Sequence, residues 1–251
     1  MKVQLIRHAT LKLNINNKTI LVDPILASKG EMTPVPGVKN QNNNPLVELP
    51  IDASVVAKAD AMLLTHIHRD HFDETAIKLI DKDIAIFCQP EDKAKIGENG
   101  FNFVNAIDQG YSWNDISFNR TGGQHGTGQI GKLMGTVSGY VITAKNESSV
   151  YITGDTIWCK EVEEALENYK PEVIISFAGS AQFSDGGDPI TMNKEHILQI
   201  CRKSPTSKVI VVHMEAWNHC MLTRKGLKEF LHESKVLDRV YIPEDGEIID
   251  L

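Results

Sequence analysis

The chain contains 251 residues, of which 41% are hydrophobic and 24% are charged, and its formal net charge at pH 7 is −7. Such a composition is typical of globular proteins and argues against a disordered or membrane-embedded chain. The sequence has no run of lysines or arginines that could follow a phosphate backbone. It also has no stretch approaching the roughly eighteen apolar residues of a membrane span. We therefore expect neither a nucleic-acid partner nor a membrane partner.

The amino terminus and the cysteines bear on the location of the protein. The first ten residues, MKVQLIRHAT, are too polar for a signal peptide, and the four cysteines show neither CxxC spacing nor clustering. This argues against a zinc finger and against a disulfide framework. We expect reduced thiols, a cytoplasmic location and a single domain spanning residues 1–251.

The amino-terminal part of the chain has the pattern of short strands. Strands are expected at residues 3–7, 11–15 and 19–23, with the turn INNK joining the last two as a hairpin. Residues 27–50 contain four prolines, two glycines and an asparagine cluster, which predict a long irregular loop. Loops of this length are usually functional or disordered.

The rest of the chain changes rhythm near its middle. A strand at 59–65 and a helix at 73–82 are followed by strands at 83–89, 101–107, 115–121, 136–144 and 148–155. Helices at 159–169, 193–203 and 223–234 then alternate with strands at 172–179, 207–214 and 238–244. This order predicts two sheets packed face to face with helices outside, in the α+β class.

A cluster of polar residues follows the strand predicted at 59–65. Residues 66–71, HIHRDH, contain three histidines and one aspartate. No capping, turn or packing rule asks for this pattern, whereas imidazoles and carboxylates are the ligands of zinc and similar divalent metals. Further candidates also follow predicted strands, and the full set is His66, His68, Asp70, His71, His125, Asp155 and His213.

The number of candidates predicts the number of metals. Seven ligands exceed what one tetrahedral ion can use, so two ions are expected at the edge where the strands end. Taken alone, His125 or His213 would more often be a surface or core histidine, and Asp155 a turn or cap residue. Each of them follows a predicted strand, as the HIHRDH cluster does, so ligation is favoured once that cluster is accepted as metal-binding.

The motifs THIHRDH, the isolated His125, TGDT and VVHMEAWNH resemble, in order and spacing, the motif series of the metallo-β-lactamase superfamily. Within it, IRHAT followed by ILVDPIL is similar to the branch containing ascorbate-6-phosphate lactonase and related metal-dependent hydrolases. The resemblance implies a four-layer αββα sandwich. It also implies that His66, His68 and His125 bind one metal, that Asp70, His71 and His213 bind the second, and that Asp155 bridges both. True β-lactamases differ in this second site, so antibiotic hydrolysis is not expected.

Two such ions can hold a bridging water acidic enough to supply hydroxide near neutral pH. We therefore expect a dinuclear metal-dependent hydrolase acting on a small polar molecule, with a lactone or other carboxylic ester favoured. A phosphodiester stays open, because the same hydroxide attacks either bond. A non-catalytic metal-binding or regulatory module and a diiron redox protein are the other readings. Zinc and manganese are the expected metals, iron is a further option, and a homo-oligomer is left open.

Residues near the ligands have candidate roles. Asp70 is expected to orient the water and move its proton, and His219 to protonate the leaving group or bind substrate. Asp23 would receive the second ring proton of a ligand histidine or act as a turn residue. His8 would belong to the site or be structural.

Other segments have weaker claims on the site. Trp217 is expected to wall the pocket, and Asp188 to begin a turn before a helix, in a loop that could approach substrate. His196 and His232 fall within predicted helices. The loop at 28–50 is expected to cover the metal edge, because its two ends flank the strands that lead to the candidate ligands.

Overall fold

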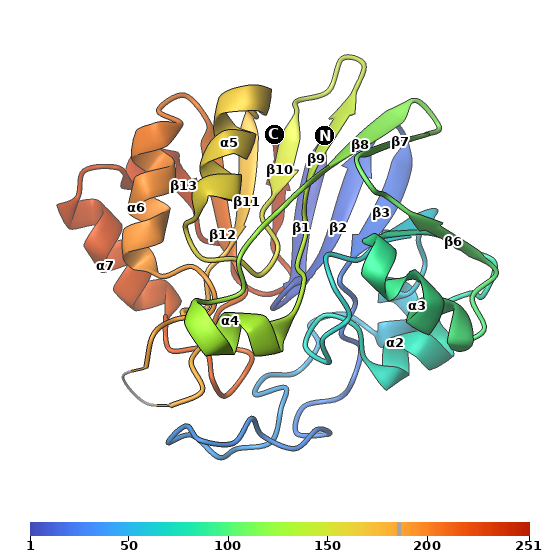
Figure 1. The fold of residues 1–251 in the computed structure, drawn as a ribbon, viewed down its shortest axis with the longest axis horizontal. Coiled ribbons are helices and arrows are strands. Elements are labelled where there is room, and N and C mark those ends of the chain that lie inside the picture. The colour runs from blue at the N-terminus through green and yellow to red at the C-terminus, as the bar shows by residue number, and fades with distance from the viewer. Residues whose placement is uncertain (185–186) are drawn as a thin grey trace.

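One side of the molecule is a mixed sheet (Figure 1). The computed structural model describes residues 1–184 and 187–251. The strands of this sheet are β1 (Lys2–Arg7), β2 (Thr10–Ile15), β3 (Lys18–Val22), β4 (Ala61–Leu63), β5 (Ala85–Cys88), β6 (Phe103–Ala106) and β14 (Ile248–Asp250). Their spatial order is β14-β1-β2-β3-β4-β5-β6. The pairs from β14 to β3 are antiparallel and those from β3 to β6 are parallel.

The second sheet mirrors this arrangement. Its strands are β7 (Gly110–Trp113), β8 (Ile116–Thr121), β9 (Gly139–Ala144), β10 (Val150–Ile152), β11 (Val173–Phe177), β12 (Lys208–Val212) and β13 (Val240–Tyr241). Their order is β13-β12-β11-β10-β9-β8-β7. The pairs from β7 to β10 are antiparallel and those from β10 to β13 are parallel.

Helices cover the outer faces of both sheets, as Figure 1 shows. The α-helices are α1 (Ala53–Val56), α2 (Glu74–Leu79), α3 (Lys93–Glu98), α4 (Gly128–Met134), α5 (Lys160–Tyr169), α6 (Lys194–Lys203) and α7 (Arg224–Glu233), and the short 3-10 helices are η1 (Pro90–Asp92) and η2 (Leu237–Arg239). Helices α5, α6 and α7 pack on the second sheet, and α2 and α3 lie on the first. No helix among the described residues is long and apolar enough to cross a membrane.

The layers follow from the side-chain pattern of the strands. In β2, Leu11, Leu13 and Ile15 are buried in the core between the sheets, whereas Lys12 and Asn14 point away from it, because successive strand residues face opposite sides. Strands of both sheets contribute to this central core, and a separate apolar cluster lies under the helices of each sheet. The αββα sandwich expected from the sequence is confirmed.

The sequence pattern did not predict several elements of the structure. The short strands β7 and β14 and the helices α3 and α4 were not predicted, because each is brief and buries little surface of its own. Conversely, the strand expected at 238–244 spans only Val240–Tyr241 and follows a 3-10 turn. Residues 27–50 contain no helix or strand, as expected, apart from a single bridge between Met32 and Asn44.

The topology brings certain strand ends to one edge of the sandwich. In the first sheet, β1, β3 and β4 run in the same direction, and in the second sheet β8, β10 and β12 do. Residues that follow these six strands therefore meet at one edge. The loop of residues 24–50 and helix α4 lie along this edge (Figure 1).

Candidate metal centre

All seven candidate ligands converge at this edge. The ring nitrogens of His66, His68 and His125 form one group in which every ligand atom lies within 4.8 Å of the others. A second group, with the same spacing, consists of Asp70, His71, Asp155 and His213. Each side chain belongs to a segment that leaves the carboxyl end of a strand, which is why residues distant in sequence meet.

The HIHRDH segment is held in place by hydrogen bonds at both ends. Asp23 accepts bonds from the backbone nitrogen of Thr65 (2.8 Å) and from its hydroxyl (2.7 Å), just before the cluster. At the other end Asp73 caps α2 by accepting a bond from the nitrogen of Ala76 (2.7 Å). The backbone nitrogen of His71 donates to the carbonyl of His68 (2.9 Å), so the segment turns sharply between strand and helix.

Two of the histidines are oriented by bonds to their outward nitrogens. The Nδ1 of His71 donates to Oδ2 of Asp23 (2.9 Å), and the Nδ1 of His125 donates to the carbonyl of Ile190 (2.8 Å). Each bond fixes the tautomer and leaves the Nε2 lone pair facing the centre. This is the usual arrangement behind a metal-binding histidine. Asp23 thus receives the ring proton of a candidate ligand, which is one of the two roles expected from the sequence.

Asp155 lies between the two groups. Its Oδ2 is 3.2 Å from Nε2 of His71 and 3.6 Å from Nε2 of His125, while its Oδ1 is 3.2 Å from Nε2 of His213. The carboxylate thus faces ring nitrogens of both groups.

The donor set fits divalent metal ions. The Nε2 of His66 lies 2.9 Å from Nδ1 of His68, and the Nε2 atoms of His71 and His213 are 3.2 Å apart. These ring nitrogens converge on one another, and the buried Oδ1 of Asp155 has no hydrogen-bond partner among the described residues. Buried polar atoms are normally partnered. A cation that accepts several lone pairs at once satisfies them all, so the cluster can hold metal.

The electrostatics of the cluster agree with this. Burial lowers the pKa of His66 and of His213 well below the usual histidine value, so both rings are neutral near pH 7. Burial also acts on His71, but Asp155 and Asp23 outweigh it and raise its pKa well above the usual value. The pKa of Asp155 is well below the usual range, because His213 and His71 outweigh the effect of burial. A bound cation would take the place of the His71 proton, since a ligand imidazole is neutral.

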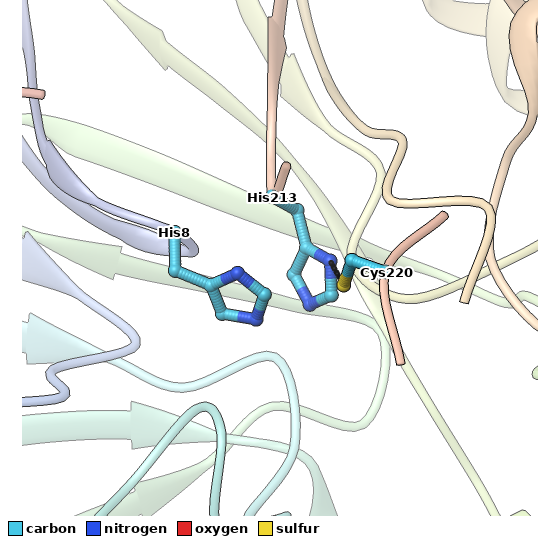
Figure 2. Close-up of side chains that lie close together, drawn as sticks. All are labelled: His8, His213 and Cys220. Atoms are coloured by element: carbon cyan, nitrogen blue, oxygen red, sulfur yellow. Dashed lines mark hydrogen bonds between the residues drawn. The ribbon is translucent and has the colours of Figure 1, made fainter. Parts of the chain in front are cut away.

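A third group surrounds the back of His213. Figure 2 shows the His213 ring between His8 and Cys220, with its Nδ1 3.9 Å from Sγ of Cys220. The ring of His8 lies against that of His213 at a centroid distance of 3.7 Å and an interplanar angle of 36°, and its Nε2 is 3.7 Å from Oδ2 of Asp70. His8 therefore reaches the site, although neither of its nitrogens has a hydrogen-bond partner among the described residues.

A cavity of about 300 Å³ opens onto the centre. Its polar lining is His68, Arg69, Asp70, His125 and His219. Its apolar lining is Val35, Pro36, Met134, Phe183, Ile190 and Trp217. The candidate metal ligands thus form one wall of a pocket whose other walls are largely apolar.

Three sequence expectations concern this pocket. His219 and Trp217 both line it, and the loop at 28–50 contributes Val35 and Pro36 to its wall. Asp188 is exposed and does not line the pocket, and His196 and His232 lie in helices α6 and α7. Asp70 is buried at 8% exposure, with the rings of His8 and His213 beside its carboxylate.

Sequence reasoning missed most of the apolar lining. Phe183, Ile190 and Met134 lie in irregular segments or in the short helix α4, where no periodicity marks a side chain as facing a pocket. Arg69 stands within the HIHRDH motif, but nothing in its spacing separates it from a solvated surface residue. The contact of Cys220 with His213 was also unexpected, and only its closeness in sequence to VVHMEAWNH could have indicated it.

Comparison with known proteins agrees with this geometry. The model of the beta-lactamase superfamily domain matches residues 18–214. The UPF0173 protein YddR of Bacillus subtilis is 38% identical over 251 aligned residues, which cover 98% of each chain. Further relatives of this chain are described as UPF0173 metal-dependent hydrolases. One of them, from Bacillus cereus, is 26% identical over 223 residues, or 85% of each chain.

Two solved structures are similar along the whole chain. The isothiocyanate hydrolase from Delia radicum gut bacteria has a TM-score of 0.94 at 37% identity, covering 100% of this chain and 99% of that one. A possible metal-dependent hydrolase from Veillonella parvula has a TM-score of 0.96 at 37% identity, with the same coverage. Matched by the family model over most of its length and by a relative at 38% identity over 98% of it, the chain belongs to the metallo-β-lactamase superfamily and is a metal-dependent hydrolase of that fold.

Proposed function

We propose that this protein uses two divalent metal ions to hydrolyse a small electrophile with an apolar substituent, and that an isothiocyanate is its substrate class. The observation that carries the proposal is the pocket, in which an apolar chamber opens directly onto the ligand cluster. A reactive carbon held against the metals would place its substituent among apolar side chains, where burial is favourable.

The lining argues against a highly charged substrate. Among the described residues of the lining, Arg69 alone has a permanent positive charge. Its guanidinium donates to the hydroxyl (3.1 Å) and carbonyl (2.8 Å) of Thr33. Apart from bound metals, the described lining thus offers few free cationic donors to a phosphate group. The small polar substrate expected from the sequence is therefore revised toward a molecule with an apolar side.

Similarity to a solved enzyme supports the substrate class. The structure at 37% identity over the full chain is that of an isothiocyanate hydrolase, and an isothiocyanate is small, uncharged and usually substituted by an apolar group. A lactone or other carboxylic ester is the second candidate, because it offers a similar electrophilic carbon and its ring carbons would fit the same apolar chamber.

The metals would be held as the converging groups suggest. His66, His68 and His125 would bind one ion and Asp70, His71 and His213 the other, with Asp155 between them. Nitrogen and carboxylate ligands suit zinc, manganese and iron. Bound there, the ions supply Lewis acidity and acidify a water enough for attack near neutral pH.

The chain's own residues would move the protons. Hydrolysis of an isothiocyanate joins the water oxygen to the central carbon, breaks the carbon–nitrogen bond and yields a primary amine and carbonyl sulfide. Both water protons end on the amine nitrogen. Asp70 lines the pocket and can accept one of them and return it to the nitrogen. His219 lines the same pocket and can donate a hydrogen bond to the nitrogen as it leaves.

Metal analysis and a substrate screen test this proposal together. Protein purified without added metal is analysed for its elements, stripped, and reloaded with zinc, manganese or iron. Each form is assayed with benzyl isothiocyanate, a small lactone and bis-p-nitrophenyl phosphate. The products measured are the amine and carbonyl sulfide, the hydroxy acid, and p-nitrophenol, respectively. We expect two ions per chain and fastest turnover of the isothiocyanate. One ion at saturation would refute the dinuclear site, and preference for the lactone or the phosphodiester would refute the substrate class.

A further inference from the structure

The wall of the pocket formed by residues 24–50 has little secondary structure of its own. It supplies Val35 and Pro36 to the lining, yet it contains no helix or strand between residues 27 and 50. Its position relative to the metals must therefore depend on contacts with other parts of the chain.

One side chain from the far end of the sequence makes several of these contacts. The Oδ1 of Asn218 accepts bonds from the backbone nitrogen of Val35 (2.9 Å) and from Nδ2 of Asn44 (2.8 Å). Its Nδ2 donates to the carbonyls of Val35 (2.9 Å) and Asn40 (2.7 Å). Its backbone nitrogen donates to Oδ1 of Asn44 (2.8 Å). Asn218 is 2% exposed, so these bonds are shielded from competing water.

Asn218 stands between two residues that line the pocket. Trp217 precedes it and packs in an apolar cluster with Ile25 and Val35, and His219 follows it. The same short segment therefore contributes Trp217 and His219 to the pocket lining and, through Asn218, binds the loop that contributes Val35. A shift of Asn218 relative to the loop would change the width of the chamber.

The base of the loop is held separately. The guanidinium of Arg7 donates to the carbonyls of Ile25 (3.1 Å) and Ala27 (2.8 Å) where the loop begins, and to that of Val47 (3.0 Å) where it returns. Loss of Asn218 would thus free the stretch from Val35 to Asn44 from these bonds, while Arg69 still binds Thr33 and the two ends of the loop stay attached.

We infer that Asn218 is a positioning residue that sets substrate specificity, by holding residues 33–44 as a fixed wall against the apolar substituent. The inference rests on the proposed function for the identity of the substrate, but not for the position of the wall. Asparagine suits the task because its amide both donates and accepts, as the two bonds to the backbone of Val35 require. Aspartate has the same shape but cannot donate to the carbonyls of Val35 and Asn40.

The test compares Asn218→Asp and Asn218→Ala with Asn44→Ala, which removes the partner side chain from the loop. The control is Asn43→Ala on the same loop, since Asn43 is exposed and its Nδ2 donates to the carbonyl of Gly30 (3.0 Å) within that loop. Each metal-loaded variant is assayed with methyl and with benzyl isothiocyanate. Metal content and amide hydrogen exchange of residues 33–44 are measured alongside.

We expect KM for the benzyl compound to rise about tenfold or more in the Asn218 and Asn44 variants, a size typical of losing hydrophobic fit in a pocket. The kcat for the methyl compound should stay within about twofold of the parent value, because the substitutions leave the candidate metal ligands unchanged. Exchange of residues 33–44 should accelerate, the metal content should stay the same, and Asn43→Ala should resemble the parent throughout.

Two results would overturn the inference. One is an equal loss of activity on both compounds together with loss of metal, which would make Asn218 a general structural residue. The other is unchanged kinetics and unchanged exchange. If the parent hydrolyses no isothiocyanate, the proposed substrate fails instead. The exchange of residues 33–44, with the KM of a short against a long acyl lactone, then decides the role of Asn218 independently.

Discussion

The Nδ1 of His71 lies 2.9 Å from Oδ2 of Asp23, a residue 48 positions earlier in the chain. Both side chains are fully buried, and the same carboxylate also accepts two bonds from Thr65. Asp23 therefore connects the end of β3 to the histidine cluster after β4. It is the residue that orients His71 toward the metal centre.

Replacing Asp23 with asparagine should weaken metal binding. An amide accepts a weaker bond from His71 and can present its NH2 group to the ring instead, so the imidazole loses orientation and basicity. We expect metal affinity to fall by about 10- to 100-fold, measured by competition with a chelator. Asp60→Asn is the control, since Asp60 accepts bonds from Thr19 and Lys18 near the surface at the other end of β3. Parental affinity in Asp23→Asn would show that the contact is dispensable.

Asp70→Asn should reduce turnover far more than it reduces stability. The asparagine keeps the shape but cannot take a proton from the attacking water, and such assistance is worth a factor of about 10² to 10⁴. Melting temperatures must be compared on metal-depleted proteins, because bound metal stabilises the fold by mass action. We expect them to be similar. If the variant with two metals bound turns over substrate at the parental rate, Asp70 serves only as a metal ligand and does not transfer the proton.

His219 should act as a hydrogen-bond donor and not as an acid that titrates near neutrality. Burial lowers the pKa of His219 to about 4, so the ring is neutral at working pH. We expect His219→Leu to lower kcat by about 10²-fold and His219→Gln to retain more activity. The shape of the pH–rate profile above pH 5 should not change, since no proton leaves this group there. An inflection near pH 6 in the profile of the parent that is absent from the profile of His219→Gln would contradict this prediction. The control is His232→Gln, because His232 is exposed.

The thiol of Cys88 should make stability fall at high pH. Burial raises the pKa of Cys88 to about 12 from an ordinary value of 9.0. Between these values the unfolded chain binds fewer protons than the folded one, so the free energy of unfolding decreases as pH rises. Full separation of the two states corresponds to about 1.4 kcal/mol for each pH unit.

Urea unfolding of the parent and of Cys88→Ala at intervals from pH 8 to pH 11 measures this effect. We expect the decline above pH 9 to be shallower in the variant. The comparison is between slopes, because the alanine also leaves a cavity that lowers stability equally at every pH. Identical slopes would mean that the Cys88 thiol ionises alike in both states.

The sequence alone determined most of the strands, the two-sheet arrangement and the identity of the converging ligands. Apolar alternation in segments such as Leu11–Ile15 specifies strands locally. The HIHRDH cluster needs no tertiary information either, because its residue types have no local structural purpose. Chain direction then explains the convergence, since segments that leave similarly directed strands meet at one edge.

Only the tertiary structure decided the shape of the pocket. Asn218 bonds to Val35 and Asn44 across 183 and 174 residues, and the partners of an amide cannot be read from its own neighbours in sequence. Phe183 and Met134 face the chamber because the segments that bear them, an irregular stretch and the short helix α4, lie along the same edge, although neither has a periodic pattern. The distances between such segments are set by how the two sheets pack, which is a property of the whole core and not of any local stretch.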